Sequence, residues 1–384
     1  MYLSKKVKKL SPLGQDSSST CAEYKKLKKI IIDKMILFIV SSLFYLIIRG
    51  YIIQLPNLKI NMEKCLFRFM ILLLLGVNVF ALDLVTLYRY EGINSVEKEL
   101  ENKLKDIAYW QDYFKDKNVD YGYYEFKKYI LVAQKKQLEI AMYERVDNNY
   151  NLILKNNVIV GENSGDKYLE GDKRTPEGVY ELIEKKVGLD SFYGPFALVT
   201  SYPNVFDQSL DKNGSGIWIH GIPYNADREK FTKGCIALDN NELENLEKKI
   251  DLNKTVLLTA ENILKKATKD EMALILSSIY KWKDAWKYSN IEAYLSFYSK
   301  DFKRSDKTGF GLFSEQKKSV FSKNEQKTIK FSNIDISPYP NSFGKNMFKV
   351  LMDEEYISPS VKFNGKKELF LEIVNNQVKI LSED

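Results

Sequence analysis

The chain has 384 residues, 45% of them hydrophobic, which is long enough for two or three domains with sizeable cores. Its formal net charge of +7 is unevenly distributed, because residues 1–61 hold eleven Lys or Arg and only three Asp or Glu, whereas residues 82–384 are close to neutral. The part expected to fold therefore lacks the basic surface typical of nucleic-acid-binding proteins, and we predict no nucleic-acid partner.

Two apolar runs follow the basic N-terminus. The first, Met35–Ile48, is fourteen residues long and marginal for a membrane span. The second, Phe69–Val77, lies between two basic residues and a small-x-small sequence that ends at Ala81. Residues 62–81 thus have the three regions of a secretory signal peptide. If both runs crossed the membrane, the second would return the rest of the chain to the cytoplasm.

We therefore expect Met62 to be the functional start and residues 1–61 to be an extension read from upstream. The alternative is an inner-membrane anchor with Met35–Ile53 as its span. In either case the inner membrane is contacted only through the signal peptide or the anchor. Cys21 and Cys65 belong to these segments, which leaves Cys235 as the single cysteine of an exported chain. An unpaired cysteine in an oxidising compartment indicates a reactive thiol.

Residues 82–126 are predicted to be a small helical domain. From Asn94 to Phe114, apolar residues recur every three or four positions, which is typical of an amphipathic helix. These apolar residues are Val96, Leu100, Leu104, Ile107, Trp110 and Phe114. The apolar stripe needs a covering surface, either a second copy of the chain in a homodimer or the domain that follows.

The period changes to two after Tyr129, so we begin a second domain at residue 127 and end it near residue 264. Many short strands with Gly- and Asn-rich turns predict a mostly-β sandwich or barrel. The expected strands are Tyr129–Ala133, the alternating run 138–142, Leu152–Leu154, Val158–Val160, Val179–Ile183, Phe196–Thr200, Ile217–His220, Cys235–Leu238 and Thr255–Thr259, with a short helix at Asn241–Lys249.

The chemistry concentrates between residues 216 and 238. A β-rich run brings His220, the only histidine, to the end of a strand, and Cys235 follows fifteen residues later. A thiol and an imidazole at two strand ends can meet, and the imidazole can hold the thiol as thiolate. Gly234 lets a carbonyl approach the backbone and leaves amide groups as oxyanion donors. The alternative is a buried structural cysteine and histidine. Two such ligands are too few for zinc, so we predict no metal.

A third domain, residues 265–384, begins with a capping box at Thr268 and Glu271 that starts an amphipathic helix. Four β-patterned runs follow, around Lys327–Ile336, Met347–Met352, Glu368–Val374 and Gln377–Ile380. This order of helices and then strands predicts an α+β domain. Its aromatic pattern resembles NTF2-like domains, through Trp282, Trp286, Tyr294, Tyr298 and Phe302. That resemblance implies a cone-shaped fold whose pocket could bind glycan or peptide, or a surface that dimerises.

The Cys/His segment resembles the signature of the L,D-transpeptidase (YkuD-type) catalytic domain. The matching residues are His220-Gly221 and Thr232-Lys233-Gly234-Cys235-Ile236-Ala237-Leu238, with Gly171 and Thr175-Pro176-Glu177-Gly178-Val179-Tyr180 upstream. The sequence departs from the family at Ala237, where arginine is usual, and at Lys233, which is often histidine. With the NTF2-like domain, the whole arrangement resembles murein L,D-carboxypeptidases that set cell shape in helical and curved Gram-negative bacteria.

The resemblance implies a function. Cys235 is expected to be the nucleophile and His220 the base, with the Gly221 carbonyl orienting the imidazole and amides around Gly234 holding the oxyanion. We also expect substrate contacts from Trp218, Thr232, Lys233 and Ala237. The substrate would be the peptidoglycan stem tetrapeptide, trimmed to a tripeptide by loss of its terminal D-alanine, with no metal or organic cofactor.

Two other functions stay open. If a second stem's amine resolves the acyl-enzyme, the protein is a transpeptidase that forms cross-links; the missing arginine at Ala237 favours hydrolysis instead. The other possibility is a non-catalytic wall-binding scaffold that acts through the NTF2-like pocket. All three functions imply a periplasmic protein, which favours export from Met62.

Overall fold

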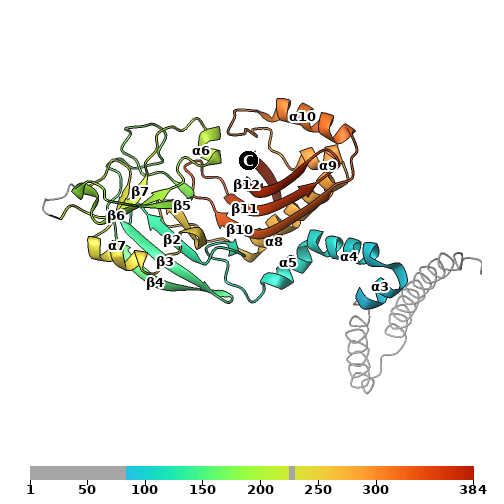
Figure 1. Cartoon of the computed structure of the whole chain (residues 1–384), viewed down its shortest axis with the longest axis horizontal. Coiled ribbons are helices and arrows are strands. Elements are labelled where there is room, and N and C mark those ends of the chain that lie inside the picture. The colour runs from blue at the N-terminus through green and yellow to red at the C-terminus, as the bar shows by residue number, and fades with distance from the viewer. Residues whose placement is uncertain (1–83, 225–229) are drawn as a thin grey trace, which may run out of the picture. The chain divides into compact units, whose positions relative to one another are not determined.

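The computed structural model describes residues 84–224 and 230–384 (Figure 1). The N-terminal extension, the candidate anchor and the signal peptide expected from the sequence lie outside the described residues. Among the residues that are described, no helix combines the length and apolar character needed to cross a bilayer. Residues 87–384 form one compact unit, built on two β-sheets.

The first sheet has eight strands in the order β4-β3-β2-β9-β5-β6-β7-β8. Its strands are β2 (Tyr129–Gln134), β3 (Glu139–Val146), β4 (Asn149–Asn157), β5 (Gly178–Val187), β6 (Phe196–Thr200), β7 (Trp218–His220), β8 (Ile236–Ala237) and β9 (Thr255–Ala260). The pairs β2–β9 and β7–β8 are parallel, and the others are antiparallel. Every residue of β9 is buried, as expected for a central strand that is covered on both faces.

The predicted strands are confirmed, with one exception. The run Val158–Val160 forms no strand of its own, and only Ile159 makes an isolated bridge, to Ala237. The predicted helix after β8 is α7 (Asn240–Glu247), capped by the Asp239 side chain and anchored in the core through buried leucines. Short helical segments connect the other strands: η3 (Ser191–Tyr193), α6 (Val205–Ser209) and η4 (Leu252–Lys254).

The second sheet has five antiparallel strands in the order β1-β10-β11-β12-β13. Its strands are β1 (Tyr123–Tyr124), β10 (Thr328–Pro338), β11 (Met347–Ile357), β12 (Lys362–Val374) and β13 (Gln377–Glu383). The helices α8 (Lys269–Lys287), α9 (Ile291–Ser296) and α10 (Phe310–Ser322) lie between β1 and β10 in the chain. Both bonds of the predicted capping box, between Thr268 and Glu271, are present at the start of α8. Figure 1 shows the long strands curving beside α8, α9 and α10. The α+β fold class is thereby confirmed.

The N-terminal helices are α3 (Leu84–Glu91), α4 (Ile93–Lys105) and α5 (Ile107–Phe114). The prediction of one continuous helix was wrong at Asp106, which is extended and caps α5 by accepting a hydrogen bond from the Ala108 amide. Trp110 and Phe114 of α5 are buried in the same core as α8, and the Trp110 ring stacks on Tyr280 at 5.8 Å. The apolar stripe of α5 is therefore covered by the C-terminal domain, so this part of residues 82–126 is not a separate domain.

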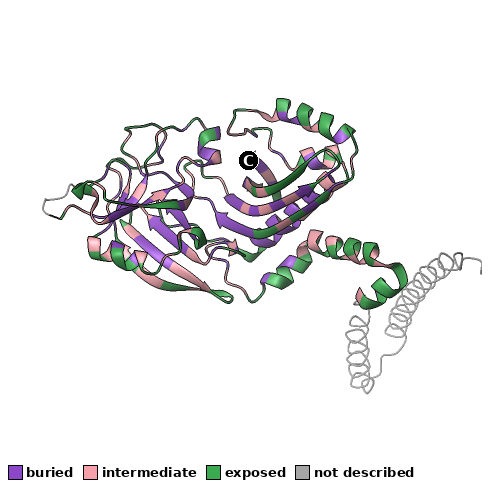
Figure 2. Ribbon diagram, in the orientation of Figure 1, coloured by how far each residue is buried: buried purple, intermediate pink, exposed green. Residues whose placement is uncertain are grey.

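The two sheets share a hydrophobic core, and Figure 2 shows buried residues on strands of both. Phe206 of α6 stacks on Phe370 of β12 at 5.3 Å, and Tyr339 packs edge-on against Phe370 at 5.4 Å. The Asn204 side chain donates a hydrogen bond of 3.1 Å to the Tyr339 hydroxyl. Buried Lys349 pairs with Glu368 of its own sheet at 2.5 Å and with Glu181 of the other at 3.7 Å. Each sheet therefore buries part of the other.

We predict that Phe370→Ala destabilises the whole described unit. The ring is fully buried between residues of both sheets, so its loss should lower the free energy of unfolding by about 3–5 kcal/mol. Because the core is shared, melting followed by probes in either sheet should keep a single transition. The control is Phe363→Ala, since Phe363 is 46% exposed on the same strand and its loss should cost far less. Two separated transitions would contradict a shared core.

Candidate active site

His220 lies at the end of β7 and is almost completely buried. Its Nδ1 atom is 2.7 Å from the carbonyl oxygen of Gly221. A carbonyl can only accept, so in the neutral ring the proton sits on Nδ1 and the Nε2 atom keeps its lone pair. The ring is flanked by Tyr193, edge-on with centroids 5.1 Å apart, and by Phe192 at 6.4 Å. The site thus holds the imidazole in the tautomer that a general base requires.

Cys235 immediately precedes β8, which pairs in parallel with β7. The register aligns Ile219 with Ile236 and His220 with Ala237, and both isoleucines are buried in the core of the first sheet. Because side chains alternate along a strand, Cys235 lies on the face of His220 and not on the core face. The thiol is partly exposed, and its Sγ atom is 3.5 Å from the Gly216 carbonyl. Topology therefore brings the predicted thiol and imidazole to one face of one strand pair.

The turn before Cys235 is held by the Thr232 hydroxyl. Its oxygen accepts a hydrogen bond from the Gly234 amide at 3.0 Å and donates one to the Cys235 carbonyl at 2.7 Å. The Gly234 amide, one of the amides around Gly234 and Cys235 that were expected to hold the oxyanion, is therefore bonded within the turn. Glycine is needed there for another reason: its φ is +136°, and a Cβ atom would lie 2.8 Å from the Arg174 carbonyl oxygen.

Two of the four expected substrate contacts are buried. Ala237 has no exposed surface, and its backbone is bonded in both directions to Ile159. Thr232 is 7% exposed, and its hydroxyl serves the turn. Direct substrate contact by these two residues is therefore not supported. Trp218 is half-buried beside Tyr193 and has the Lys186 ammonium 5.5 Å from its ring, while Lys233 is exposed.

The upstream Thr-Pro-Glu-Gly element, residues 175–178, belongs to a loop that packs against the turn before Cys235. The Thr175 hydroxyl accepts from the Gly161 amide at 2.9 Å, and buried Lys135 donates to the Thr175 carbonyl at 3.0 Å. Burial raises the pKa of Glu177, against the opposing effect of the Lys135 ammonium 3.8 Å away. A buried cation so surrounded by carbonyls and carboxylates fixes the loop that packs against Gly234.

A second buried cation, Lys212, fixes the same loop. Its ammonium lies 2.6 Å from Asp166 and 2.8 Å from Asp207, and all three side chains are buried. Burial alone would lower the pKa of Lys212, but the two carboxylates raise it. Asp166 also accepts the Glu177 amide at 2.8 Å, so this ion triad is tied directly to the Thr-Pro-Glu-Gly element.

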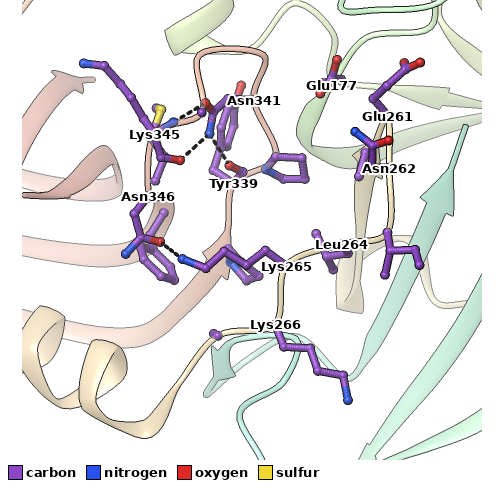
Figure 3. A pocket seen from close by; sticks show the side chains of 18 residues that line it. Glu177, Glu261, Asn262, Leu264, Lys265, Lys266, Tyr339, Asn341, Lys345 and Asn346 are labelled. Atoms are coloured by element: carbon purple, nitrogen blue, oxygen red, sulfur yellow. Dashed lines mark hydrogen bonds between the residues drawn. The ribbon is translucent and has the colours of Figure 1, made fainter. Parts of the chain in front are cut away.

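A cavity of about 240 Å³ lies elsewhere, between the two sheets (Figure 3). Glu177, Glu261, Lys265, Tyr339 and Lys345 are among its lining residues, and neither Cys235 nor His220 lines it. Its lysines are engaged within the protein, for example Lys345 with Glu372 at 3.0 Å. In the part of the chain that the structure describes, no group of three or more His, Cys, Asp or Glu side chains is arranged to hold a metal ion.

The sequence did not predict Asn240, a residue that contacts the backbone next to His220. Its side-chain oxygen accepts a hydrogen bond of 2.8 Å from the Ile222 amide, directly after His220-Gly221. A Cβ atom on Gly221 would lie 2.1 Å from that oxygen, so the close approach of Asn240 explains the glycine. The only signal in the sequence was a position next to the predicted helix at Asn241–Lys249, which does not reveal what the side chain reaches.

Comparison with known proteins agrees with this geometry. Residues 127–258 match the L,D-transpeptidase catalytic domain (YkuD), and residues 274–384 match the Cds6 C-terminal NTF2-like domain. The chain belongs to the family of peptidoglycan-acting proteins that join an L,D-transpeptidase catalytic domain to a C-terminal NTF2-like domain. It is accordingly an enzyme of the L,D-transpeptidase family.

Solved structures give the particular relatives. The helical cell shape determining protein Pgp2 from Campylobacter jejuni is 39% identical, with a TM-score of 0.70 over 73% of this chain and 100% of that one. A point mutant of Pgp2 gives 38% identity and a TM-score of 0.71. Bd1075 of Bdellovibrio bacteriovorus is 26% identical, with a TM-score of 0.56 over 70% of this chain and 96% of that one. No curated protein sequence matches the chain significantly.

We predict that Thr232→Val lowers kcat/KM by about 10- to 100-fold, whereas Thr232→Ser keeps most of the activity. Valine preserves the shape but leaves the Gly234 amide and the Cys235 carbonyl without their shared partner, at about 1–3 kcal/mol. Serine keeps the hydroxyl. Steady-state kinetics on purified peptidoglycan fragments measure the effect. Equal activity of the valine and serine variants would show that the hydroxyl does not hold the turn.

Proposed function

We propose that the protein is an L,D-carboxypeptidase that removes the terminal D-alanine from peptidoglycan stem tetrapeptides through a Cys235 acyl-enzyme. The observation that carries the proposal is the 2.7 Å contact between His220 Nδ1 and the Gly221 carbonyl, which leaves Nε2 as base on the face where Cys235 lies. The match of residues 127–258 to the L,D-transpeptidase domain supports the substrate class.

The proposed reaction has two halves. In the first, the Cys235 sulfur attacks the carbonyl carbon of the amide between the L-centre of diaminopimelate and D-alanine, and His220 Nε2 takes the thiol proton. The tetrahedral intermediate collapses, the C–N bond breaks, and the imidazolium gives its proton to the departing amine. In the second half, Nε2 takes a proton from water, and the hydroxide attacks the thioester. The C–S bond breaks, the tripeptide leaves with a new carboxylate, and the imidazolium returns its proton to the Cys235 sulfur.

Transpeptidation is the second candidate, because the matching domain family is named for it. Both reactions share the acyl-enzyme and differ in whether water or a second stem's amine attacks it. In our proposal, Ala237 favours hydrolysis of the acyl-enzyme over transpeptidation. An arginine at this position could bind the carboxylate of an acceptor stem and so position it, whereas the buried methyl group of Ala237 cannot. An acceptor held in place has a high effective concentration, which an amine needs in order to compete with water.

The proposal extends to location and biological role. Peptidoglycan stems lie outside the inner membrane, so we propose a periplasmic enzyme delivered by the signal peptide at residues 62–81 or held by the alternative anchor. Pgp2 is described as a helical cell shape determining protein, and we propose that this chain also affects cell shape. We also propose wall binding by the NTF2-like domain. For a homodimer through the N-terminal helices we propose α4, where Ile93 and Leu100 are exposed, because the apolar stripe of α5 is already covered.

We predict that Cys235→Ser and Cys235→Ala abolish turnover while the melting temperature stays close to that of the wild type. A serine hydroxyl is far less acidic than a thiol, so His220 cannot activate it to the same degree. Purified muropeptides are incubated with each variant and the products are identified by mass spectrometry. Asn241→Ala is the control, because it changes an exposed residue outside the site and should leave activity unchanged.

The products separate the candidate functions. Tripeptide with free D-alanine supports the carboxypeptidase, and cross-linked dimers support the transpeptidase. If neither forms and a thiol reagent labels Cys235 poorly at neutral pH, the thiol is inert and the wall-binding scaffold is favoured. Full turnover by Cys235→Ala would place the nucleophile elsewhere and reject the proposal.

A further inference from the structure

Asn240, the first residue of α7, clamps the backbone that follows the catalytic His-Gly pair. Its Oδ1 atom accepts a hydrogen bond of 2.8 Å from the Ile222 amide, and its Nδ2 atom donates one of 3.0 Å to the Ile222 carbonyl. A side-chain amide that satisfies both polar groups of one distant residue leaves that residue little freedom to rotate. No step of the proposed reaction uses Asn240, so its role must be sought in what it holds.

The clamped amide and the carbonyl that faces His220 belong to the same peptide unit. The Ile222 N–H and the Gly221 C=O are joined through one planar peptide bond, and that bond is trans. In a trans peptide these two groups point in opposite directions. Fixing the Ile222 N–H on Asn240 therefore aims the Gly221 oxygen away from Asn240, and this oxygen is the one that lies 2.7 Å from His220 Nδ1.

The same arrangement strengthens the bond to the imidazole. When an amide donates its N–H to a good acceptor, its own carbonyl becomes more polarised and accepts more strongly. The three groups Asn240, the 221–222 peptide and His220 thus form one chain of hydrogen bonds. At its far end, the proton is held on Nδ1 and the lone pair on Nε2.

The fold holds Asn240 in place for this contact. The Asp239 side chain caps α7 by accepting from the Asn241 amide, and Leu243 and Leu246 are fully buried. Two glycines leave room for the Asn240 oxygen, because a Cβ atom on Gly221 would lie 2.1 Å from it and one on Gly194 would lie 2.4 Å from it. A side chain surrounded this closely cannot move to another rotamer without displacing the loop.

We propose that Asn240 is a positioning residue that sets the tautomer of His220 through the Gly221–Ile222 peptide, and so sets the acidity of the Cys235 thiol. The catalytic consequence rests on the function proposed above. The tautomer and the thiol acidity do not, since both can be measured without substrate. The proposal and the proposed function can therefore fail separately.

The test compares Asn240→Ala and Asn240→Asp in the full chain, with Asn241→Ala as the matched control. Asn241 is the exposed neighbour and lies outside the clamp. Aspartate keeps an oxygen of the same reach that can accept from the Ile222 N–H, and it replaces the donor to the Ile222 carbonyl with a second oxygen that carries negative charge. Alanine loses both. Because His220 is the only histidine, the imidazole ¹⁵N resonances report its tautomer without assignment.

We expect the Nδ1–H tautomer to dominate in the wild type, Asn241→Ala and Asn240→Asp, and a mixture of tautomers in Asn240→Ala. The pH midpoint for alkylation of Cys235 by iodoacetamide, followed on its own peptide by mass spectrometry, should rise by about one unit in Asn240→Ala. In the same variant kcat/KM on stem tetrapeptide should fall by about tenfold or more. Asn240→Asp should recover most of the tautomer preference and of the alkylation midpoint.

Two results would overturn the proposal. The first is an unchanged tautomer and alkylation midpoint in Asn240→Ala, even if its melting temperature falls, because a purely structural residue would behave in that way. The second is equal loss in the alanine and aspartate variants, which would show that the acceptor for the Ile222 N–H is not what matters. If Asn240→Ala does not fold, Asn240→Ser takes its place, because a serine side chain is too short to bond both polar groups of Ile222. An unchanged tautomer and alkylation midpoint in the folded serine variant would contradict the proposal.

Discussion

The parallel pairing of β7 with β8 is the constraint on which the site depends. Neighbouring parallel strands cannot be joined by a tight hairpin, so the chain must leave the end of β7 and return to the start of β8 through a crossover. His220 ends the first strand and Cys235 precedes the second, so the crossover necessarily begins at one functional group and finishes at the other. The geometry of its two ends then decides whether thiol and imidazole meet.

Each end of the crossover is fixed by a small polar side chain rather than by packing alone. At the start, Asn240 bonds both polar groups of Ile222. At the finish, the Thr232 hydroxyl bridges the Gly234 amide and the Cys235 carbonyl. Both glycines of the motif are required by close backbone or side-chain approach at these points, Gly221 to Asn240 and Gly234 to the Arg174 carbonyl. Within the motif, His220 and Cys235 are the reactive groups, whereas Gly221 and Gly234 are needed for close packing at the two ends of the crossover.

The sequence was sufficient for the parts of the structure that depend on local pattern. Alternating apolar residues located the strands, and the capping box located the start of α8. The apolar runs beside His220 and Cys235 predicted two strands, and these strands pair as β7 and β8. The sequence was insufficient where a residue packs against or bonds to a residue that is distant in the chain. The stripe ending at Trp110 and Phe114 predicted burial but not burial against α8, because an amphipathic helix specifies that it must be covered and not by what.

The same limit applies at the candidate site. The Gly234 amide was among the amides expected to hold the oxyanion, and only the folded turn shows that it is bonded to the Thr232 hydroxyl. Ala237 looked like an altered substrate contact because the family has arginine there, yet pairing with His220 on one side and Ile159 on the other removes all its exposed surface. Burial of this kind depends on two non-local neighbours, and no local pattern records it.

The shared core gives the C-terminal domain a second consequence for the active site. Asn204 and Phe206 of the first sheet's domain contact Tyr339 and Phe370 of the second, and Asp207 in the same short helix belongs to the ion triad with Lys212 and Asp166. That triad is bonded to the Glu177 amide and thus to the loop whose Arg174 carbonyl packs on Gly234. A continuous path of buried contacts therefore runs from β12 to the turn that carries Cys235. Because buried ions tolerate little displacement before they lose their partners, we expect changes in the C-terminal core to alter the geometry at Cys235 and not only the overall stability.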